Sequence, residues 1–70
     1  MTRFYVTYTV NESRTGEYCD SKRDASNLAR KMSKNGSISQ IYRCSGIMHN
    51  GTFYETESTY VAHYKDGKRQ

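Results

Sequence analysis

The segment from Ser21 to Gly36, SKRDASNLARKMSKNG, constrains the fold most, because three independent signals within it agree on a helix. Ser21 and Asp24, three residues apart, have the outline of a capping box at a helix N-terminus. Asn35-Gly36 supplies a left-handed stop at the other end. Between them, apolar residues recur at i, i+3, i+4 and i+7 and form one stripe: Ala25, Leu28, Ala29 and Met32. The sequence therefore predicts an amphipathic helix over residues 21–35.

The residues before this helix predict one long strand and one short strand. Over residues 3–10, apolar and polar side chains alternate with the period of two that is typical of a strand with one buried face. Residues 11–16 are polar and end in glycine, which predicts a turn. Residues 17–19, Glu-Tyr-Cys, then predict a short second strand.

The residues after the helix predict a long hairpin, with strands at 38–49 and 52–64 around the turn signal Asn50-Gly51. Counting outward from a two-residue turn puts Ile47 beside Tyr54 and Ile41 beside Tyr60 on the core face, with Ala62 and Tyr64 beyond. The opposite face then pairs Met48 with Phe53, Gly46 with Glu55, Cys44 with Glu57 and Tyr42 with Thr59. Gly46 favours a bulge, which would shift this register at the far end. Residues 65–70 predict a polar, frayed tail with a turn at Asp66-Gly67.

Together these elements predict an α+β fold, namely an antiparallel sheet of three or four strands with one helix packed on one face. The chain has 70 residues, near the lower limit for a self-supporting core, so we expect a single domain over residues 1–70. An isolated hairpin is only marginally stable, so the helix must supply much of the missing burial.

Positive charge is concentrated on the predicted helix. Residues 22–34 contain five basic residues and one acid, a balance of +4 that equals the net charge of the whole chain. At 100° per residue, the side of the helix opposite the apolar stripe carries Arg23, Asn27, Arg30 and Lys34, with Lys31 alongside. Such a ridge has two explanations: an ordinary solvated face, or a surface that meets an anionic partner. The absence of glutamate at i, i+4 positions favours a partner, because a ridge of one sign repels itself.

Two further surfaces are candidates for binding. Lys65, Lys68 and Arg69 form a basic patch in the tail, which is either a soluble terminus or a second anion contact. The outward face of the sheet is expected to display aromatic and apolar side chains, Tyr5, Tyr42, Met48 and Phe53. Such a face can stack nucleobases, or a second subunit can cover it in a homodimer.

Nothing in the sequence predicts catalysis, a cofactor or a metal site. His49, His63, Cys19 and Cys44 match no zinc-ligand spacing, and Glu55 and Glu57 are ordinary strand carboxylates. We therefore expect a binding protein and not an enzyme. Two cysteines and no apolar run of membrane length predict a cytoplasmic protein with reduced thiols and no membrane partner.

Two stretches carry a resemblance to a known family. The helix pattern Ala25-x-x-x-Ala29 running into Arg30-Lys31-Met32-Ser33-Lys34 resembles small phage-encoded anti-CRISPR proteins of a type I-F inhibitor family, and so does the closing Ala62-His63-Tyr64-Lys65-Asp66-Gly67-Lys68-Arg69. The resemblance implies one helix on a small antiparallel sheet. It also implies binding to the backbone subunits of a crRNA-guided surveillance complex, which keeps target DNA out. The first strand and residues 45–58 depart from the family pattern.

The sequence thus predicts an inhibitor that binds protein subunits of a CRISPR effector complex or a similar nucleic-acid machine. The alternative is a small basic protein that binds DNA or RNA directly. A third prediction, an interaction module or homodimer with its sheet face buried, stays open.

Overall fold

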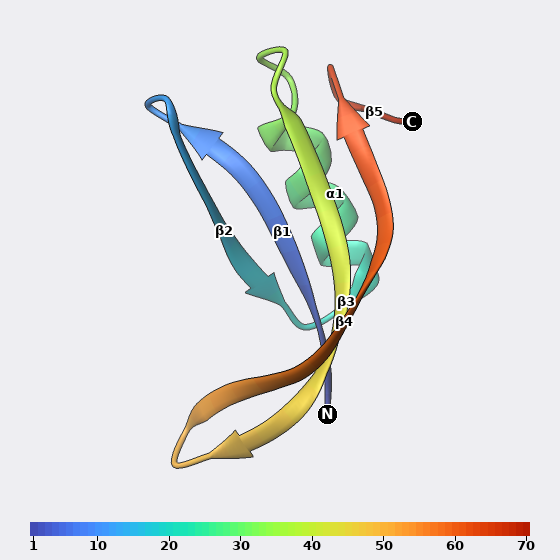
Figure 1. Cartoon of the computed structure of the whole chain (residues 1–70). Helices are drawn as coiled ribbons and strands as arrows, with labels where there is room; N and C mark the ends of the chain where they lie inside the picture. Colours follow the sequence, from blue (N-terminus) through green and yellow to red (C-terminus); the bar gives the residue numbers. More distant parts are fainter.

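One helix lies along one face of a curled antiparallel sheet in the computed structural model, which describes all of residues 1–70 (Figure 1). The sheet has five strands in the order β2-β1-β3-β4-β5. In chain order the elements are β1 (Thr2–Val10), β2 (Ser13–Cys19), α1 (Lys22–Met32), β3 (Ile38–His49), β4 (Thr52–Lys65) and β5 (Lys68–Arg69). The α+β class is confirmed, whereas the prediction of three or four strands is wrong by the addition of β5.

Helix α1 begins where the sequence predicts and ends earlier. The Asp24 backbone N–H donates to Ser21 Oγ at 3.1 Å, which caps the first turn. The helix ends at Met32, and the Ser33 N–H donates to the Ala29 carbonyl at 3.0 Å. Ser33 is fully buried and bonded to a distant turn, so the helix stops there and not at Asn35-Gly36. With eleven residues of mixed charge, α1 is neither long nor apolar enough to span a bilayer.

The second strand is longer than predicted. Asn11 and Glu12 have φ values of 49° and 67°, so they alone form the turn and Val10 pairs with Ser13. This geometry is that of a two-residue hairpin turn. Gly16, which the sequence places in a turn, lies inside β2. A Cβ atom there would lie 2.6 Å from the Tyr5 ring, so this glycine allows close approach and does not end a strand.

The long hairpin has the predicted turn but not the predicted register. Asn50 and Gly51 form a two-residue turn, and pairing is as predicted from His49/Thr52 to Gly46/Glu55. The register then shifts twice along β4, and the first shift lies at Ser45/Gly46, where the glycine predicts a bulge. As a result Cys44 pairs with Ser58 and not Glu57, Tyr42 with Tyr60 and not Thr59, and Ile41 with Ala62 and not Tyr60. Two residues of β4, Thr56 and Val61, are the extra ones, and the Thr56 hydroxyl donates to the Ser45 carbonyl at 3.1 Å.

The first shift moves Tyr60 to the open side, opposite Tyr42, and the second returns Ala62 to the core side, opposite Ile41, because a one-residue slip moves a side chain to the other face of a strand. Ile47 and Tyr54 keep their predicted pairing, but they lie near the hairpin turn, which α1 does not cover (Figure 1). Three residues predicted to be in the core are exposed: Ile47 at 61 %, Tyr54 at 51 % and Tyr60 at 50 %. Ala62 and Tyr64, beyond the second shift, are buried as predicted.

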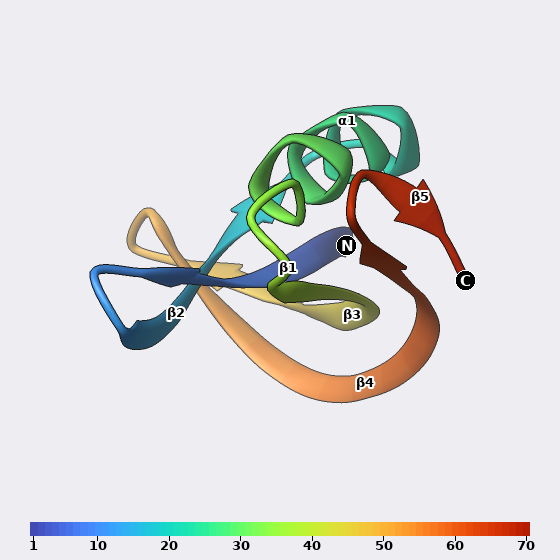
Figure 2. The ribbon, with the colours of Figure 1, turned by 90° about the horizontal axis from the view of Figure 1, so that it is seen from above.

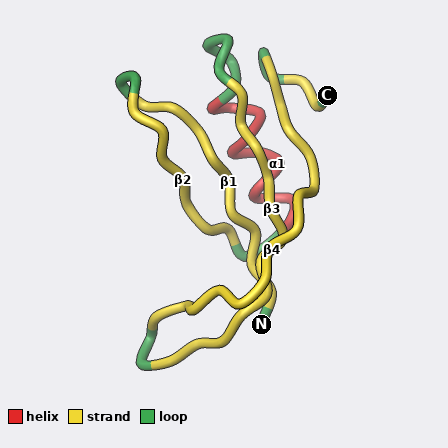
Figure 3. Tube along the Cα trace, viewed as in Figure 1, coloured by secondary structure: helices red, strands yellow, loops and turns green.

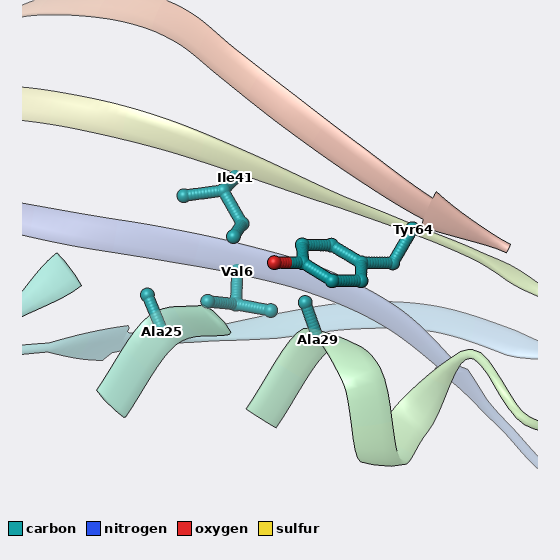
Figure 4. Close-up of a cluster of buried hydrophobic side chains, with 5 residues drawn as sticks. All are labelled: Val6, Ala25, Ala29, Ile41 and Tyr64. Carbon is teal, nitrogen blue, oxygen red and sulfur yellow. The ribbon is translucent and has the colours of Figure 1, made fainter. Parts of the chain in front are cut away.

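The core is small and joins the helix to three central strands. Val6, Ala25, Ala29, Ile41 and Tyr64 form one buried cluster (Figure 4). Ala25 and Ala29 have no accessible surface and point from α1 toward Val6 and the Tyr64 ring. Small side chains at these two positions let the helix axis approach the sheet closely, and partly buried residues around them complete the core: Phe4, Tyr8, Cys19, Leu28 and Val61.

The sheet curls strongly at both ends of the long hairpin. Seen from above, β4 sweeps in an arc that brings β5 beside α1 (Figure 2). At the other end, the part of the hairpin around its turn swings sideways below the end of β2 (Figure 3). Bulges increase local strand twist, so the two shifts in β4 account for this curl. Gly46 is needed at the bend, since a Cβ atom there would lie 2.2 Å from the Tyr54 carbonyl oxygen.

The predicted frayed tail is ordered as a strand. Asp66 and Gly67 have φ values of 53° and 77° and form the predicted turn. Lys68 and Arg69 then pair with Lys65 and Tyr64.

The corrected register makes a direct prediction about stability. Ile41→Ala should lower the free energy of unfolding by about 2–5 kcal/mol, because Ile41 is only 1 % exposed and its loss leaves a cavity. Ile47→Ala is the matched control on the same strand, and a change of less than about 1 kcal/mol is expected there. Urea unfolding followed by circular dichroism measures both. Equal losses in the two variants would contradict the observed burial of Ile41 and exposure of Ile47, which lie on the same face of β3.

Candidate functional site

The basic side chains of α1 are free of carboxylate partners. All five predicted site residues of this segment are exposed: Arg23, Asn27, Arg30, Lys31 and Lys34. The only ion pair in the protein is elsewhere, between Arg3 and Asp20 at 3.2 Å. Arg30 donates to the Asn27 side-chain oxygen at 3.2 Å, and its guanidinium lies 5.8 Å from the centre of the Tyr64 ring. The charges of the helix are therefore positioned by neutral groups and remain available to an anion.

The structure joins the end of this helix to the basic residues of the tail. The Gly67 N–H donates to Ser33 Oγ at 3.0 Å, and Ser33 Oγ donates to the Arg30 carbonyl at 3.2 Å. The Cβ position at Gly67 lies 3.4 Å from Cγ of Lys34, so the turn packs directly on that side chain. Figure 2 shows β5 beside α1. We call the cations of these two adjoining segments the basic surface: Arg30, Lys31, Lys34, Lys65, Lys68 and Arg69. Arg69 pairs with buried Tyr64 and shares its side of the sheet, whereas Lys65 and Lys68 pair with each other and face the other side of this edge.

The charge of the basic surface is almost entirely of one sign. Its six cations come from two segments that lie about thirty residues apart in sequence, and the carboxylate nearest to them in the chain is Asp66 in the turn. Three of the six follow the last turn of α1 or belong to it, where the helix dipole is negative and stabilises cations. Arg23 and Asn27 lie nearer the start of the helix, so the predicted ridge extends away from the basic surface along α1.

The aromatic residues predicted for binding lie on the other face of the sheet, which we call the open face because no helix covers it. The pairing of Tyr5 with both Tyr18 and Tyr42 puts these three side chains on one face, whereas Val6 and Ile41, one residue along, face α1. Two edge-to-face ring pairs are formed there. Tyr5 and Tyr18 have ring centroids 4.9 Å apart, and Tyr42 and Tyr60 have centroids 6.0 Å apart.

The curl of the long hairpin folds its end over the open face. Phe53 on β4 contacts Tyr18 on β2 with ring centroids 5.2 Å apart, although β1 and β3 lie between those strands in the sheet. Tyr18 Oη also donates to Glu55 Oε1 at 3.1 Å. The Arg3 guanidinium covers this junction, 5.4 Å from the centre of the Tyr18 ring and 5.7 Å from that of Phe53.

A hollow of about 490 Å³ lies between the open face and the folded-over end of the hairpin, and its volume is within the range of small-ligand sites. Four strands line it, through the residues Tyr5, Thr7, Tyr18, Tyr42, Cys44, Glu55 and Ser58. Cys44 is fully buried at its base, and burial, together with the nearby Glu55 carboxylate, raises the pKa of its thiol to about 11. Burial and the hydrogen bond to Glu55 also raise the pKa of Tyr18. The hollow thus presents neutral aromatic and thiol groups with one carboxylate.

The predicted site residues therefore divide between two surfaces. The helix cations and Arg69 lie on the helix side, and Lys65 and Lys68 lie on the other side of the adjoining sheet edge. Tyr5, Tyr42 and Phe53 lie on the open face. Three contributors to this site were not among the predicted site residues: Tyr18, Glu55 and Arg14. Tyr18 follows from strand alternation once β2 is extended to Ser13. The sequence places Glu55 on this face opposite Gly46, but its contact with Tyr18 depends on the curl of β4.

The remaining reactive side chains do not form a site. No three of the histidine, cysteine, aspartate and glutamate residues are grouped so that they could hold a metal ion. Cys19 and Cys44 are both free thiols, and their strand pairing puts them on opposite faces of the sheet.

Comparisons with known proteins give no further identification. No family model matches the chain, and neither a curated protein nor a solved structure is significantly similar to it.

The Cys44 environment predicts slow thiol chemistry with a defined pH dependence. With a pKa of about 11, only about one Cys44 thiol in a thousand is ionised at pH 8, so iodoacetamide should alkylate it at least about a hundredfold more slowly in the folded protein than in urea. The rate should rise about tenfold per pH unit up to that pKa. Because the folded pKa is raised, the thiol also favours folding below pH 9, and that contribution is lost as the pH rises further.

Peptide mapping by mass spectrometry measures the extent of alkylation at Cys44 and at Cys19 separately in the same sample. Equal alkylation of Cys44 in the folded and urea-unfolded protein at pH 8 would contradict a closed base of the hollow.

Proposed function

We propose that this protein is a small binding protein that inhibits a nucleic-acid machine by docking its basic surface on an anionic part of that machine. The observation that carries the proposal is the convergence of helix and tail cations with no carboxylate paired to any of them. A surface of one sign destabilises the free protein slightly, and an anionic partner relieves that repulsion. The proposed mode of action is occupancy: the bound protein blocks access of target nucleic acid, and no chemical step is needed.

The resemblance to anti-CRISPR proteins indicates which nucleic-acid complex to test first as the partner. In that form of the proposal, the partner is a type I-F crRNA-guided surveillance complex, and the protein contacts its protein subunits beside the bound RNA. The stretches that carry the resemblance, residues 25–34 and 62–69, are also the two that meet in the basic surface. Their proximity supports the idea that both act in one contact. Inhibition of such a complex would place the protein in the cytoplasm of the host cell.

A second candidate function is direct binding of DNA or RNA. The aromatic hollow on the open face favours it, because exposed rings on a sheet are used to stack unpaired bases. The two functions use opposite faces of the sheet, so variants can separate them.

The first function is tested by charge reversal on the basic surface. Lys34→Glu/Lys68→Glu changes one cation from each half of the surface, and neither side chain is buried. We expect the double variant to inhibit binding of target DNA to a purified type I-F surveillance complex about tenfold or more less effectively than the native protein, because two attractive charges become repulsive. Electrophoretic mobility of labelled target DNA gives the inhibition directly.

The matched control is Lys22→Glu/Arg43→Glu, which makes the same change in net charge at two exposed positions outside the basic surface. It should stay within about threefold of the native protein, the residual effect being long-range electrostatics. If native protein neither binds the complex nor inhibits it, this target is wrong. If both double variants lose activity equally, net charge and not the basic surface is responsible.

A further inference from the structure

The hollow on the open face is a second site, separate from the basic surface, and its lining indicates what it binds. Three tyrosine rings line it, and they pack edge to face: Tyr5 with Tyr18 at 60° between ring planes, and Tyr42 at 74° with Tyr60, which lies outside the hollow. Arg3 lies over the Tyr18 ring, whereas no cation lies over Tyr5 or Tyr42, and the face of such a ring is a platform for a flat π-system. A flat aromatic group is therefore the ligand shape that this lining fits best.

The single carboxylate in the hollow adds a polar preference. Glu55 accepts a hydrogen bond from Tyr18 at Oε1, which orients its side chain, and its carboxylate lies beside the Cys44 thiol. A carboxylate accepts hydrogen bonds only and can accept several, so Glu55 favours a ligand that carries an N–H or O–H group. Carboxylates recognise the amino group of cytosine in this way, and adenine and guanine carry the same kind of group.

The guanidinium group of Arg14 lies at one end of the hollow. The Arg14 guanidinium donates to Thr7 Oγ1 at 2.8 Å and to Thr9 Oγ1 at 3.1 Å, and Thr7 lines the hollow. Arg14 is exposed and has no carboxylate partner. An arginine held by two neutral hydroxyl groups keeps its full charge, and the whole chain has a net charge of +4, so the ligand that fits this rim is anionic.

A cationic ligand fits less well. Tyrosine rings beside a glutamate can form a cage for an ammonium group, yet here guanidinium groups occupy both ends of the ring cluster, Arg14 by Thr7 and Arg3 over Tyr18 and Phe53. A second copy of the chain would also bring its own net positive charge to this rim. A flat base joined to a phosphate meets both the stacking and the charge requirement.

We propose that the hollow on the open face binds an unpaired nucleobase of a single-stranded nucleic acid. The base stacks among Tyr5, Tyr18 and Tyr42, its amino group donates to Glu55, and the adjoining phosphate contacts Arg14. This proposal specifies the site and the base preference for direct binding of DNA or RNA, the second candidate function, and it rests on that function alone. It is independent of the CRISPR target, because the basic surface takes no part in it.

Fluorescence anisotropy with labelled hexanucleotides tests the proposal. The probes are dC6, dA6 and dT6, with rC6 and rU6 to distinguish RNA from DNA. We expect C6 and A6 to bind at least about fivefold more tightly than T6 or U6, because thymine and uracil lack an exocyclic amino group and their one donor, N3–H, is flanked by two carbonyl oxygens that repel the Glu55 carboxylate. Tyr42→Ala should weaken binding about fivefold to a hundredfold through loss of stacking. Tyr54→Ala is the matched control, since Tyr54 is 51 % exposed and lies outside the hollow.

Glu55→Gln retains a side-chain oxygen that can accept the hydrogen bond from Tyr18. It tests the preference for bases that carry an amino group and leaves every aromatic ring in place. It should abolish the discrimination between C6 and T6, because a glutamine amide can also donate to the thymine carbonyl. Arg14→Gln should weaken all probes and reduce the salt dependence by about one charge.

Several results would overturn the proposal. One is equal affinity for C6 and T6 in the native protein, and another is equal loss in Tyr42→Ala and Tyr54→Ala. If binding is lost only in Lys34→Glu/Lys68→Glu, the protein binds nucleic acid through the basic surface and the hollow does not bind bases. If light scattering shows a dimer that Tyr42→Ala dissociates, a second copy occupies the hollow instead.

Discussion

The close approach of α1 to the sheet is the contact on which the rest of the structure depends. Ala25 and Ala29 have no accessible surface, and they bring the helix backbone against Val6, Ile41 and Tyr64. Only ten residues of the chain are buried, so no other group of side chains can replace this cluster. Because the stripe is narrow, the remaining sides of α1 stay in solvent, and its arginines and lysines are exposed as a consequence.

The shape of β4 is the second determinant, because it forms both candidate sites. Its two register shifts curl the strand at each end. At one end the curl brings the turn at Gly67 onto Ser33 and unites the cations of the helix and the tail. At the other end it carries Phe53 and Glu55 over the open face to Tyr18 and encloses the hollow. A flat hairpin of the same sequence would leave the cations apart and the aromatic face unfilled.

The two faces of the sheet have different chemistry, and this division constrains any mechanism. The helix side is basic, solvated and without a cavity, which suits an extended anionic surface. The open face has a hollow with rings, a buried neutral thiol and one carboxylate, which suits a small planar group. The residues predicted for binding belong to both faces, so they cannot all contact one flat ligand surface at the same time.

Local signals in the sequence determined the elements themselves. The serine cap and apolar stripe determine α1, and the period-two alternation determines β1. The Asn-Gly and Asp-Gly pairs determine two of the turns, because each of these signals acts through residues within a few positions of one another. The concentration of charge on one helix face is likewise a property of sequence spacing.

Tertiary structure decided the register of β4, the end of α1, and the neighbours of each candidate residue. Thr56 and Val61 look like ordinary strand residues, and cross-strand packing makes them the extra residues of two bulges, which put Tyr60 on the open face. Ser33 ends the helix because a turn 34 positions away in the chain donates to its hydroxyl. Glu55 meets Tyr18 across two intervening strands. Contacts at such separations depend on how the sheet bends. The bend results from packing interactions throughout the fold, so a local sequence pattern does not predict it.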